Sequence, residues 1–286
     1  LRIRKALAHL NDRKTLIQKL FFNEYHPLNS YYQGGLYQNP KNVLIEYDEL
    51  KAVELLELAG WIGFNNEGYR VKDHRELRLT LIYRSPLSER SLTVFQEACK
   101  KAGIRLELQL LPPAASWKNL REKEYELMST GWGALIFPNP ETSFHSTLAG
   151  QKDNNNVTGF SNSQVDQLCL AYDQEYDIEK RIEIIRQIDG IVYNQHPYVL
   201  NWYLPSQRVI FWNKYGMPEW GGRRTDDSNS LFFCWWVDPE KERKLKEASA
   251  NPSSYLPKGP VENHFWAAWN ISQTNKPKPI MTSSKN

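Results

Sequence analysis

The chain has 286 residues, of which 41% are hydrophobic and 13% aromatic, which is enough apolar material for one large or two modest domains. Lysine and arginine number 36 and aspartate and glutamate 33, with both signs mixed along the chain, so a nucleic-acid partner is not suggested. The three cysteines are far apart and lack CxxC spacing, which supports neither a disulfide framework nor a zinc site.

Apolar residues at helical spacing predict several helices in the first half of the chain. Two short helices open the chain, and the second is capped near Asn11 or Asp12. Three further helices are expected, over 48–59, 91–102 and 117–122. In the first of these three, Leu50, Val53 and Leu56 are expected to face inward.

Alternating apolar and polar residues predict strands in the same half of the chain, over 77–83, 104–110 and 125–131. The first two strands flank a predicted helix, and strands joined in this way are usually parallel. The sequence therefore predicts an α/β unit. Residues 24–42 have the His, Pro, Asn, Ser and Gly content of a loop, and Tyr31 and Tyr32 contribute to its unusual aromatic character.

In the second half of the chain, helices are predicted over 163–172, 178–195 and 238–250, and strands over 198–203 and 208–212. His196-Pro197 ends the second of these helices, because proline cannot continue the hydrogen-bond ladder. Regular structure is expected to thin out beyond Gly221. The tail after about Ser272, rich in Lys, Pro, Ser and Asn, is expected to be disordered.

No motif nominates a catalytic, cofactor or metal site. The six histidines are scattered without HExxH spacing, and no GxSxG, P-loop or GxGxxG pattern occurs. The acidic clusters at 173–177 and 226–227 lack the ligand pattern of a calcium loop. No apolar run approaches the roughly 20 residues that span a bilayer. We therefore expect neither an enzyme nor a bound cofactor or metal ion.

Several segments carry a family resemblance because of their order. They are RIRKALAHLNDRKTLIQKLFF, then YELMSTGWGALIFPNPETSFHSTLAG with NNNVTGFSNSQVDQL, and finally HPYVLNWYLPSQRVIFWNKYGMPEW with FFCWWVDPEKERKLKEA. In this order they resemble the C-terminal portion of the family 5 extracellular solute-binding proteins, over about residues 1 to 250. The last segments look like the Yej-like subgroup of peptide-binding proteins.

The resemblance implies a periplasmic-binding-protein-like α/β lobe, with a mixed sheet flanked by helices. Residues 1–200 would form this second lobe, 201–271 would return to the first lobe, and 272–286 would form a disordered tail. The N-terminal lobe would then be missing, and the chain does begin inside an amphipathic helix. The implied partners are a peptide or peptide-like ligand and an ABC transporter permease, with a periplasmic or other extracytoplasmic, membrane-associated location.

The candidate ligand-binding residues are aromatic and polar side chains on predicted loops and on the C-terminal segment. They are Trp132, Phe144, Asn139, Thr130, Tyr31, Tyr32, Trp235 and Arg224. Each has a structural alternative, such as core packing for the rings and capping for Asn139. In one respect the sequence departs from the family. Peptide binders usually carry an aspartate shortly after the Gly-Trp pair, whereas residues 133–136 carry no charge.

Three functions remain open at this level. The first is capture of peptides between two lobes for import, with hinge closure presenting the loaded protein to a permease. The second is a truncated lobe that acts as a protein-interaction module through its aromatic C-terminal segment. The third is a hydrolase using scattered Ser, His and Asp residues, which the lack of any nucleophile motif disfavours.

Overall fold

The computed structural model describes residues 1–286 except for 134–136, 223–229, 252, 258 and 275–286. The chain divides into two compact units, Leu1–Pro205 (unit 1) and Ser206–Asn286 (unit 2). The predicted mixed α/β class is confirmed, since helices accompany several small sheets.

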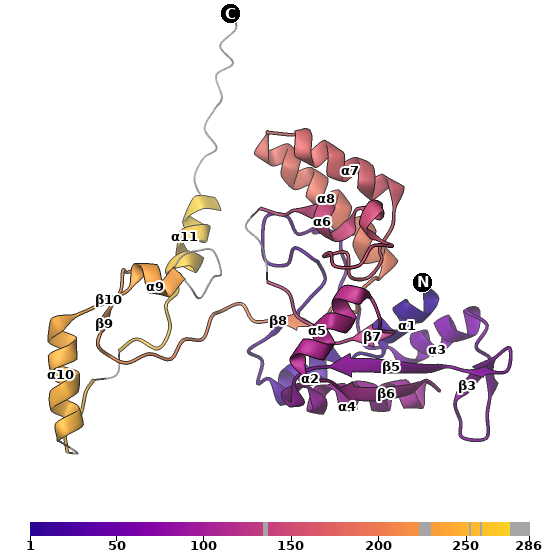
Figure 1. The fold of residues 1–286 in the computed structure, drawn as a ribbon, viewed down its shortest axis with the longest axis horizontal. Coiled ribbons are helices and arrows are strands. Elements are labelled where there is room, and N and C mark those ends of the chain that lie inside the picture. Colours follow the sequence, from indigo (N-terminus) through magenta and orange to yellow (C-terminus); the bar gives the residue numbers. More distant parts are fainter. Residues whose placement is uncertain (134–136, 223–229, 252, 258, 275–286) are drawn as a thin grey trace, which may run out of the picture. The chain divides into compact units, whose positions relative to one another are not determined.

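Unit 1 contains a three-stranded parallel sheet with the order β6–β5–β7 (Figure 1). Strand β5 (Arg78–Tyr83) pairs over its whole length with β6 (Arg105–Leu110). On its other side β5 pairs with the short β7 (Leu127–Met128). Helix α4 (Glu89–Lys101) connects β5 to β6, so the predicted parallel strand–helix–strand unit is confirmed.

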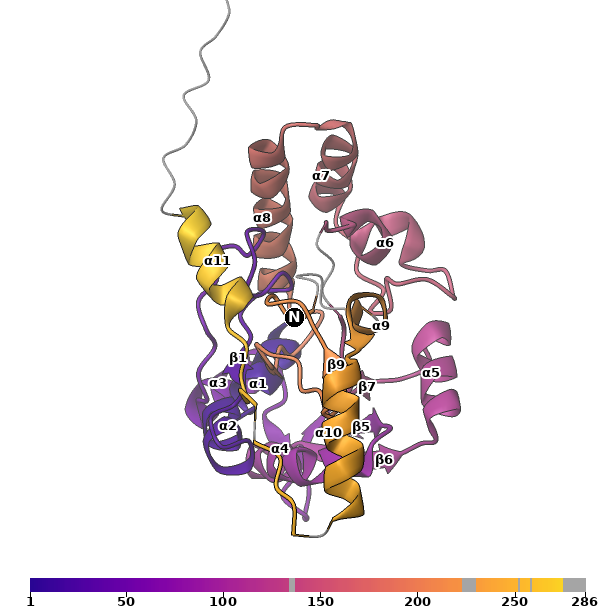
Figure 2. The ribbon, with the colours of Figure 1, turned by 90° about the vertical axis from the view of Figure 1, so that its left-hand side faces the viewer.

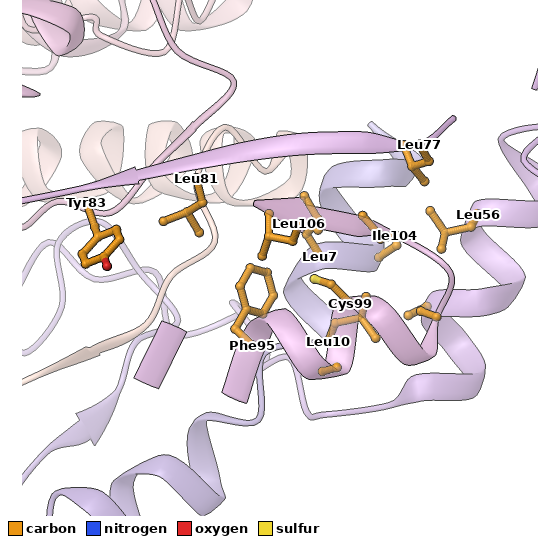
Figure 3. Close-up of a cluster of buried hydrophobic side chains, with 14 residues drawn as sticks. Leu7, Leu10, Leu56, Leu77, Leu81, Tyr83, Phe95, Cys99, Ile104 and Leu106 are labelled. Carbon is orange, nitrogen blue, oxygen red and sulfur yellow. The ribbon is translucent and has the colours of Figure 1, made fainter. Parts of the chain in front are cut away.

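One face of this sheet carries the larger hydrophobic cluster, here called the sheet core. Leu77, Leu81 and Tyr83 point from the β5 side toward Phe95 and Cys99 of α4 (Figure 3). Helices α1 (Arg2–His9) and α3 (Glu49–Leu58) pack into the same cluster. Alternation along a strand places every second side chain on one face, which is why these residues share the core.

The cap predicted near Asn11 or Asp12 is confirmed, and α3 has a cap that was not predicted. Asp12 accepts a hydrogen bond from the Thr15 backbone N–H at 3.0 Å at the start of α2 (Arg13–Leu20). Asp48 accepts one from the Lys51 N–H at 2.8 Å at the start of α3. The prediction that Leu50 faces inward is wrong, because this side chain is 83% exposed. Ala52 and Leu56, fully buried, form the inner face of α3 instead.

A small antiparallel sheet precedes β5, in the order β2 (Gly63–Phe64), β3 (Arg70–Lys72) and β4 (Arg75–Glu76). Arg105 donates to Glu76 and Glu67, which ties this sheet to the start of β6. Gly103, two residues before β6, has φ +84, and an added Cβ would lie 2.8 Å from the Arg70 side chain. Glycine is therefore required there.

Four helical segments surround the second cluster of unit 1, here called the helical core. They are α6 (Pro140–Phe144), the 3₁₀ turn η2 (Ser146–Leu148), α7 (Ser163–Gln174) and α8 (Ile178–Gln195). Three of them, α6, α7 and α8, contribute residues to this core. Helices α7 and α8 run side by side (Figure 2). Their buried residues, together with Phe144 and Phe160, make one cluster that also takes in Tyr31 and Tyr32.

The remaining short elements of unit 1 are η1 (Pro86–Ser88), α5 (Pro113–Glu122), β1 (His26–Pro27) and β8 (Trp202–Tyr203). Strand β8 pairs antiparallel with β1, so only the end of the strand predicted over 198–203 has ladder pairing.

Unit 2 consists of β9 (Tyr215–Gly216), α9 (Ser230–Cys234), β10 (Trp236–Val237), α10 (Pro239–Ala250) and α11 (Phe265–Thr274). Strands β9 and β10 pair antiparallel. The strand predicted over 208–212 is wrong: no ladder partner is present among the described residues, and Ile210 is fully exposed. Apolar side chains alone do not make a strand without a neighbour to accept its hydrogen bonds. Helix α10 is confirmed, with Asp238 as its cap.

Candidate ligand-binding site

The carboxyl ends of β5, β6 and β7 lie at one edge of the sheet, because all three strands are parallel. Three connections leave this edge, through 84–88, 111–112 and 129–139. In open α/β sheets, ligands bind outside the carboxyl ends of the strands. We therefore take this edge, here called the carboxyl edge, as the candidate site.

The carboxyl edge carries several exposed apolar side chains. Trp132 is 50% and Phe137 63% exposed, on the connection that follows β7. Leu87 in η1 is 90% exposed, and Leu110 at the end of β6 is 46% exposed. Exposed apolar side chains at the end of a sheet are the kind of surface that contacts a partly apolar ligand.

The start of the β7 connection is fixed to the sheet. The Ser129 N–H donates to the Ile82 carbonyl at 2.8 Å, one residue beyond the β7 ladder. Thr130 follows and is half-buried. Around Gly131 and Gly133, no described atom lies within 4 Å of where a Cβ would stand. Trp132 thus follows an anchored backbone segment, and half of its side chain is exposed.

Asn139 and Phe144 lie at the two ends of α6 and serve structural contacts. The Asn139 side chain accepts from the Thr142 N–H at 3.4 Å and caps the helix. Phe144 is buried, with its ring 5.2 Å from that of Tyr31 and 5.7 Å from that of Phe160. These contacts show that Phe144 packs in the core and that Asn139 caps α6. Ligand contact by either residue stays a prediction.

Tyr31 and Tyr32 lie on the predicted loop, but they pack against the helical core. Tyr31 also contacts Tyr198, with ring centroids 4.8 Å apart. Burial raises the pKa of both tyrosines, so their hydroxyls stay protonated. The backbone of this loop is attached to α8 by Asp189, a residue whose role the sequence did not reveal.

In unit 2, Trp235 is half-buried and its indole N–H donates to the Gly221 carbonyl at 2.7 Å. Its ring stands edge-on to Phe211 at 4.6 Å. Its neighbour Trp236 lies in β10 and is 52% exposed, as expected for adjacent residues of an extended segment. Arg224 lies outside the described residues.

Sequence reasoning overlooked Phe137 and Leu87. A usable signal existed: both are apolar residues on connections that follow predicted strands, Leu87 after the strand over 77–83 and Phe137 after the strand over 125–131.

The family model of the bacterial extracellular solute-binding proteins, family 5 Middle, matches residues 1–155, which is more than half of the chain. The chain belongs to this family. Its members are solute-binding proteins rather than enzymes, and they act outside the cytoplasm.

Two curated relatives illustrate the likeness of this family member to known proteins. It is 21% identical over 283 residues to the uncharacterized protein YejA of Escherichia coli, a match that covers 87% of this chain and 46% of YejA. It is 25% identical over 250 residues to the oligopeptide-binding protein AppA of Bacillus subtilis, covering 82% of this chain and 44% of AppA. The chain thus spans less than half the length of these relatives.

Solved structures of solute-binding proteins share the fold. AppA of Bacillus subtilis in complex with a nonapeptide matches with a TM-score of 0.70 and 22% identity, covering 82% of this chain and 47% of AppA. DppA of Helicobacter pylori in complex with the peptide STSA matches with a TM-score of 0.65 and 19% identity, covering 82% of this chain and 43% of DppA. NikZ of Campylobacter jejuni in complex with Ni(L-His) matches with a TM-score of 0.63 and 20% identity, covering 71% of this chain and 42% of NikZ.

The described residues include neither a cluster of metal-ligating side chains nor a membrane-spanning helix. No group of three or more His, Cys, Asp or Glu side chains in those residues is placed to hold a metal ion. Of the helices in the described ranges, none has the length and apolar character to cross a bilayer.

Proposed function

We propose that this chain forms part of a periplasmic solute-binding protein that captures peptides or peptide-like solutes for import by an ABC transporter. The family membership and the peptide-bound relatives AppA and DppA support this class of ligand. The observation that carries the proposal is the half-exposed Trp132, held on an anchored connection at the carboxyl edge.

Binding would use aromatic and apolar contacts more than charge. The rings of Trp132 and Phe137 are available to stack on a peptide bond or an apolar side chain. Thr130 and Asn139 lie at the two ends of the same connection and offer hydroxyl and amide groups. Since residues 133–136 carry no charge in the sequence, a free amino terminus would need an anchor elsewhere.

The rest of the proposed protein would supply the opposite wall of the site. Residues 201–271 would return to that other lobe, whose closure over the ligand would present the loaded protein to a permease. The exposed apolar side chains of unit 2 favour such packing against another part of the same protein. They include Ile210, Trp212, Phe232 and Phe233, at 102%, 68%, 85% and 76% exposure.

The test is mass spectrometry of small molecules that co-purify with the full-length protein, followed by calorimetric titration of the peptide found. We expect Trp132→Ala to lower affinity at least about tenfold, equivalent to roughly 1.4 kcal/mol, because an aromatic contact is lost. Phe137→Ala should weaken binding less, since a smaller ring is removed.

Phe64→Ala is the matched control. Phe64 is 56% exposed, a fraction similar to that of Phe137. It lies in β2, which belongs to the small sheet before the amino end of β5. Its removal should leave affinity unchanged. The proposal fails if no peptide co-purifies and peptide mixtures produce no rise in Tm, or if Phe64→Ala weakens binding as much as Trp132→Ala.

A further inference from the structure

Strand β6 is an edge strand of the parallel sheet of unit 1. It pairs with β5 on one side, and no other strand of the described residues pairs with its second side. Figure 1 shows β6 on one side of β5 and β7 on the other. The backbone groups on the free side of an edge strand can pair with another strand, so this free side, here called the β6 edge, is a possible interaction surface.

The register of β6 on β5 determines which backbone groups lie on the β6 edge. The Arg105 N–H donates to the Leu77 carbonyl at 2.9 Å, and the Leu111 N–H donates to the Tyr83 carbonyl at 2.9 Å. Successive residues of a strand direct their backbone groups to opposite sides. The odd-numbered residues of β6 therefore face β5, and the residues that face the β6 edge are Leu106, Leu108 and Leu110.

The backbone groups of the β6 edge are almost all without a partner in the protein. The Leu106 carbonyl accepts from Gln96 Nε2 at 2.7 Å. The other groups have no hydrogen-bond partner among the described residues: the N–H groups of all three leucines and the carbonyls of Leu108 and Leu110. The strand contains no proline, lysine or bulge, which are common means of blocking an edge.

The β6 edge is complementary to itself. If a second copy approaches antiparallel about a twofold axis through Leu108, that leucine lies opposite its own equivalent, and Leu106 lies opposite Leu110 of the second copy. Each such pair exchanges two backbone hydrogen bonds, so every outward N–H meets an outward carbonyl. The Leu106 carbonyl can take part without losing Gln96, because a carbonyl oxygen has two lone pairs.

The side chains are compatible with this register. The leucines lie on the face of the sheet core, where Leu108 is already partly buried, and pairing would cover Leu110, which is 46% exposed. On the other face, Glu107 would lie opposite Gln109 of the second copy. The two copies of Glu107 would lie diagonally across the axis, but each is paired with its own Arg78 at 2.7 Å. No two unpaired like charges are placed directly opposite each other.

We propose that two copies of this chain associate through the β6 edge, antiparallel about Leu108, and join their three-stranded sheets into one continuous sheet. The self-complementary register favours a second copy over an unrelated strand, because one short segment supplies both sides of every pair. The proposal does not depend on peptide binding.

The first experiment is sedimentation equilibrium of the whole chain at low salt, from about 10 μM to about 1 mM. We expect the average mass to rise toward twice that of one chain. Gln109→Glu places a carboxylate opposite Glu107 twice in the dimer, so the dissociation constant should rise about fivefold. Gln109→Lys places an ammonium group there and should lower it about fivefold. Both changes are made at an exposed side chain that faces away from the sheet core.

Gln164→Glu and Gln164→Lys are the matched controls. They make the same changes in net charge at an exposed position of α7, and they should leave the dissociation constant unchanged. A wild-type chain that stays monomeric over the whole concentration range would overturn the proposal. So would Gln109 variants that both shift the dissociation constant in the same direction, or that shift it no more than the Gln164 variants.

The second experiment locates the interface by amide hydrogen exchange, followed by nuclear magnetic resonance at low and high protein concentration. The amides of Leu106, Leu108 and Leu110 should exchange fast in the dilute chain and slow down as the dimer forms. The amide of Glu107, which faces β5, should be protected at every concentration. Dimer formation without slower exchange at the three leucines would overturn the proposal. Slow exchange there in the dilute monomer would also overturn it, because another part of the same chain would then cover the β6 edge.

Discussion

At the scale of single residues, Asp189 holds more of unit 1 together than any sequence pattern suggested. It is fully buried in α8, and its carboxylate accepts from the Ser30 hydroxyl at 2.7 Å and the Tyr31 N–H at 3.0 Å. It also accepts from the Asn39 N–H at 2.9 Å and the Asn42 amide at 3.0 Å. All four partners are donors, which suits an ionised carboxylate and fixes both ends of the loop on the helix.

Asp189→Asn should therefore destabilise unit 1 although it changes little in size. The amide nitrogen of asparagine donates, so at least one of the four donors would face another donor and lose its partner. We expect the free energy of unfolding in urea to fall by about 2 kcal/mol. Asp173→Asn, at an exposed position of α7, should change it by less than about 0.5 kcal/mol. Equal stability of the two variants would show that the four contacts contribute little.

The pH dependence of the same residue has a definite sign. Burial raises the pKa of Asp189 above its usual value, and the hydrogen bonds from Asn39, Ser30 and Tyr31 offset only part of this. A carboxyl whose pKa is raised in the folded state adds most to the free energy of unfolding at pH values below its unfolded pKa. That contribution is lost as pH rises through the folded-state pKa. Asparagine does not titrate, so Asp189→Asn should not lose stability in this way. The difference in the free energy of unfolding between the wild type and the variant should therefore shrink as pH rises from the unfolded-state to the folded-state pKa of Asp189.

At the scale of elements, prediction succeeded where a segment's own residues decide its structure. Helix α8 matches its predicted bounds of 178–195, because apolar residues recur at helical spacing and Asp177 and His196-Pro197 mark its ends. Strands β5 and β6 were predicted from alternation, and their parallel pairing from the helix between them. The segment 208–212 failed because pairing depends on a distant partner, which no local pattern encodes.

In the candidate site, too, features set by local sequence were predicted and features set by distant residues were not. Trp132 was identified from a loop position, and its exposure agrees with a surface role. Phe144 and Tyr31 were singled out for the same reason, yet they pack into the helical core, because residues more than 100 positions apart close around them. The attachment of the 29–42 loop to α8 spans about 150 residues of sequence and is invisible to local patterns.

The carboxyl-terminal end of α8 supplies a test of acid stability. His196 ends the helix in the left-handed region, at φ +46, and is buried, with its pKa lowered to about 4. A histidine with a lowered folded-state pKa contributes stability that is present above the unfolded pKa of about 6.5 and is lost as pH falls through about 4. The wild type should therefore weaken on acidification.

His196→Asn should remove this sensitivity, because asparagine tolerates the left-handed region and does not titrate. We expect the wild type to lose about 3 kcal/mol more than the variant between pH 7.5 and pH 4, measured by urea unfolding at each pH. His74→Asn is the control, at φ +60 on an exposed turn, and it should follow the wild-type curve. Parallel curves for the wild type and His196→Asn would contradict the expectation.

At the scale of the whole molecule, the buried hydrophobic residues belong to unit 1. The sheet core and the helical core both lie before residue 205, whereas none of the described residues of unit 2 is a buried hydrophobic side chain. Hydrophobic burial is the dominant favourable term in folding, so the two units should differ sharply in their ability to fold alone. This difference also fits the proposal that unit 2 packs against another part of a longer solute-binding protein.

Expression of residues 1–205 alone should therefore give a folded protein with a cooperative thermal transition, whereas 206–286 alone should unfold gradually without a sigmoidal transition. Circular dichroism melting of each fragment beside the whole chain checks this, with near-ultraviolet signals of the aromatic residues as a second measure of fixed packing. A shorter fragment, 43–205, should lose cooperativity, because it lacks both the loop that Asp189 holds to α8 and helix α1, whose Ala6 and Leu7 lie in the sheet core. A sharp transition in 206–286, or none in 1–205, would mean that the buried clusters do not carry the stability of the chain.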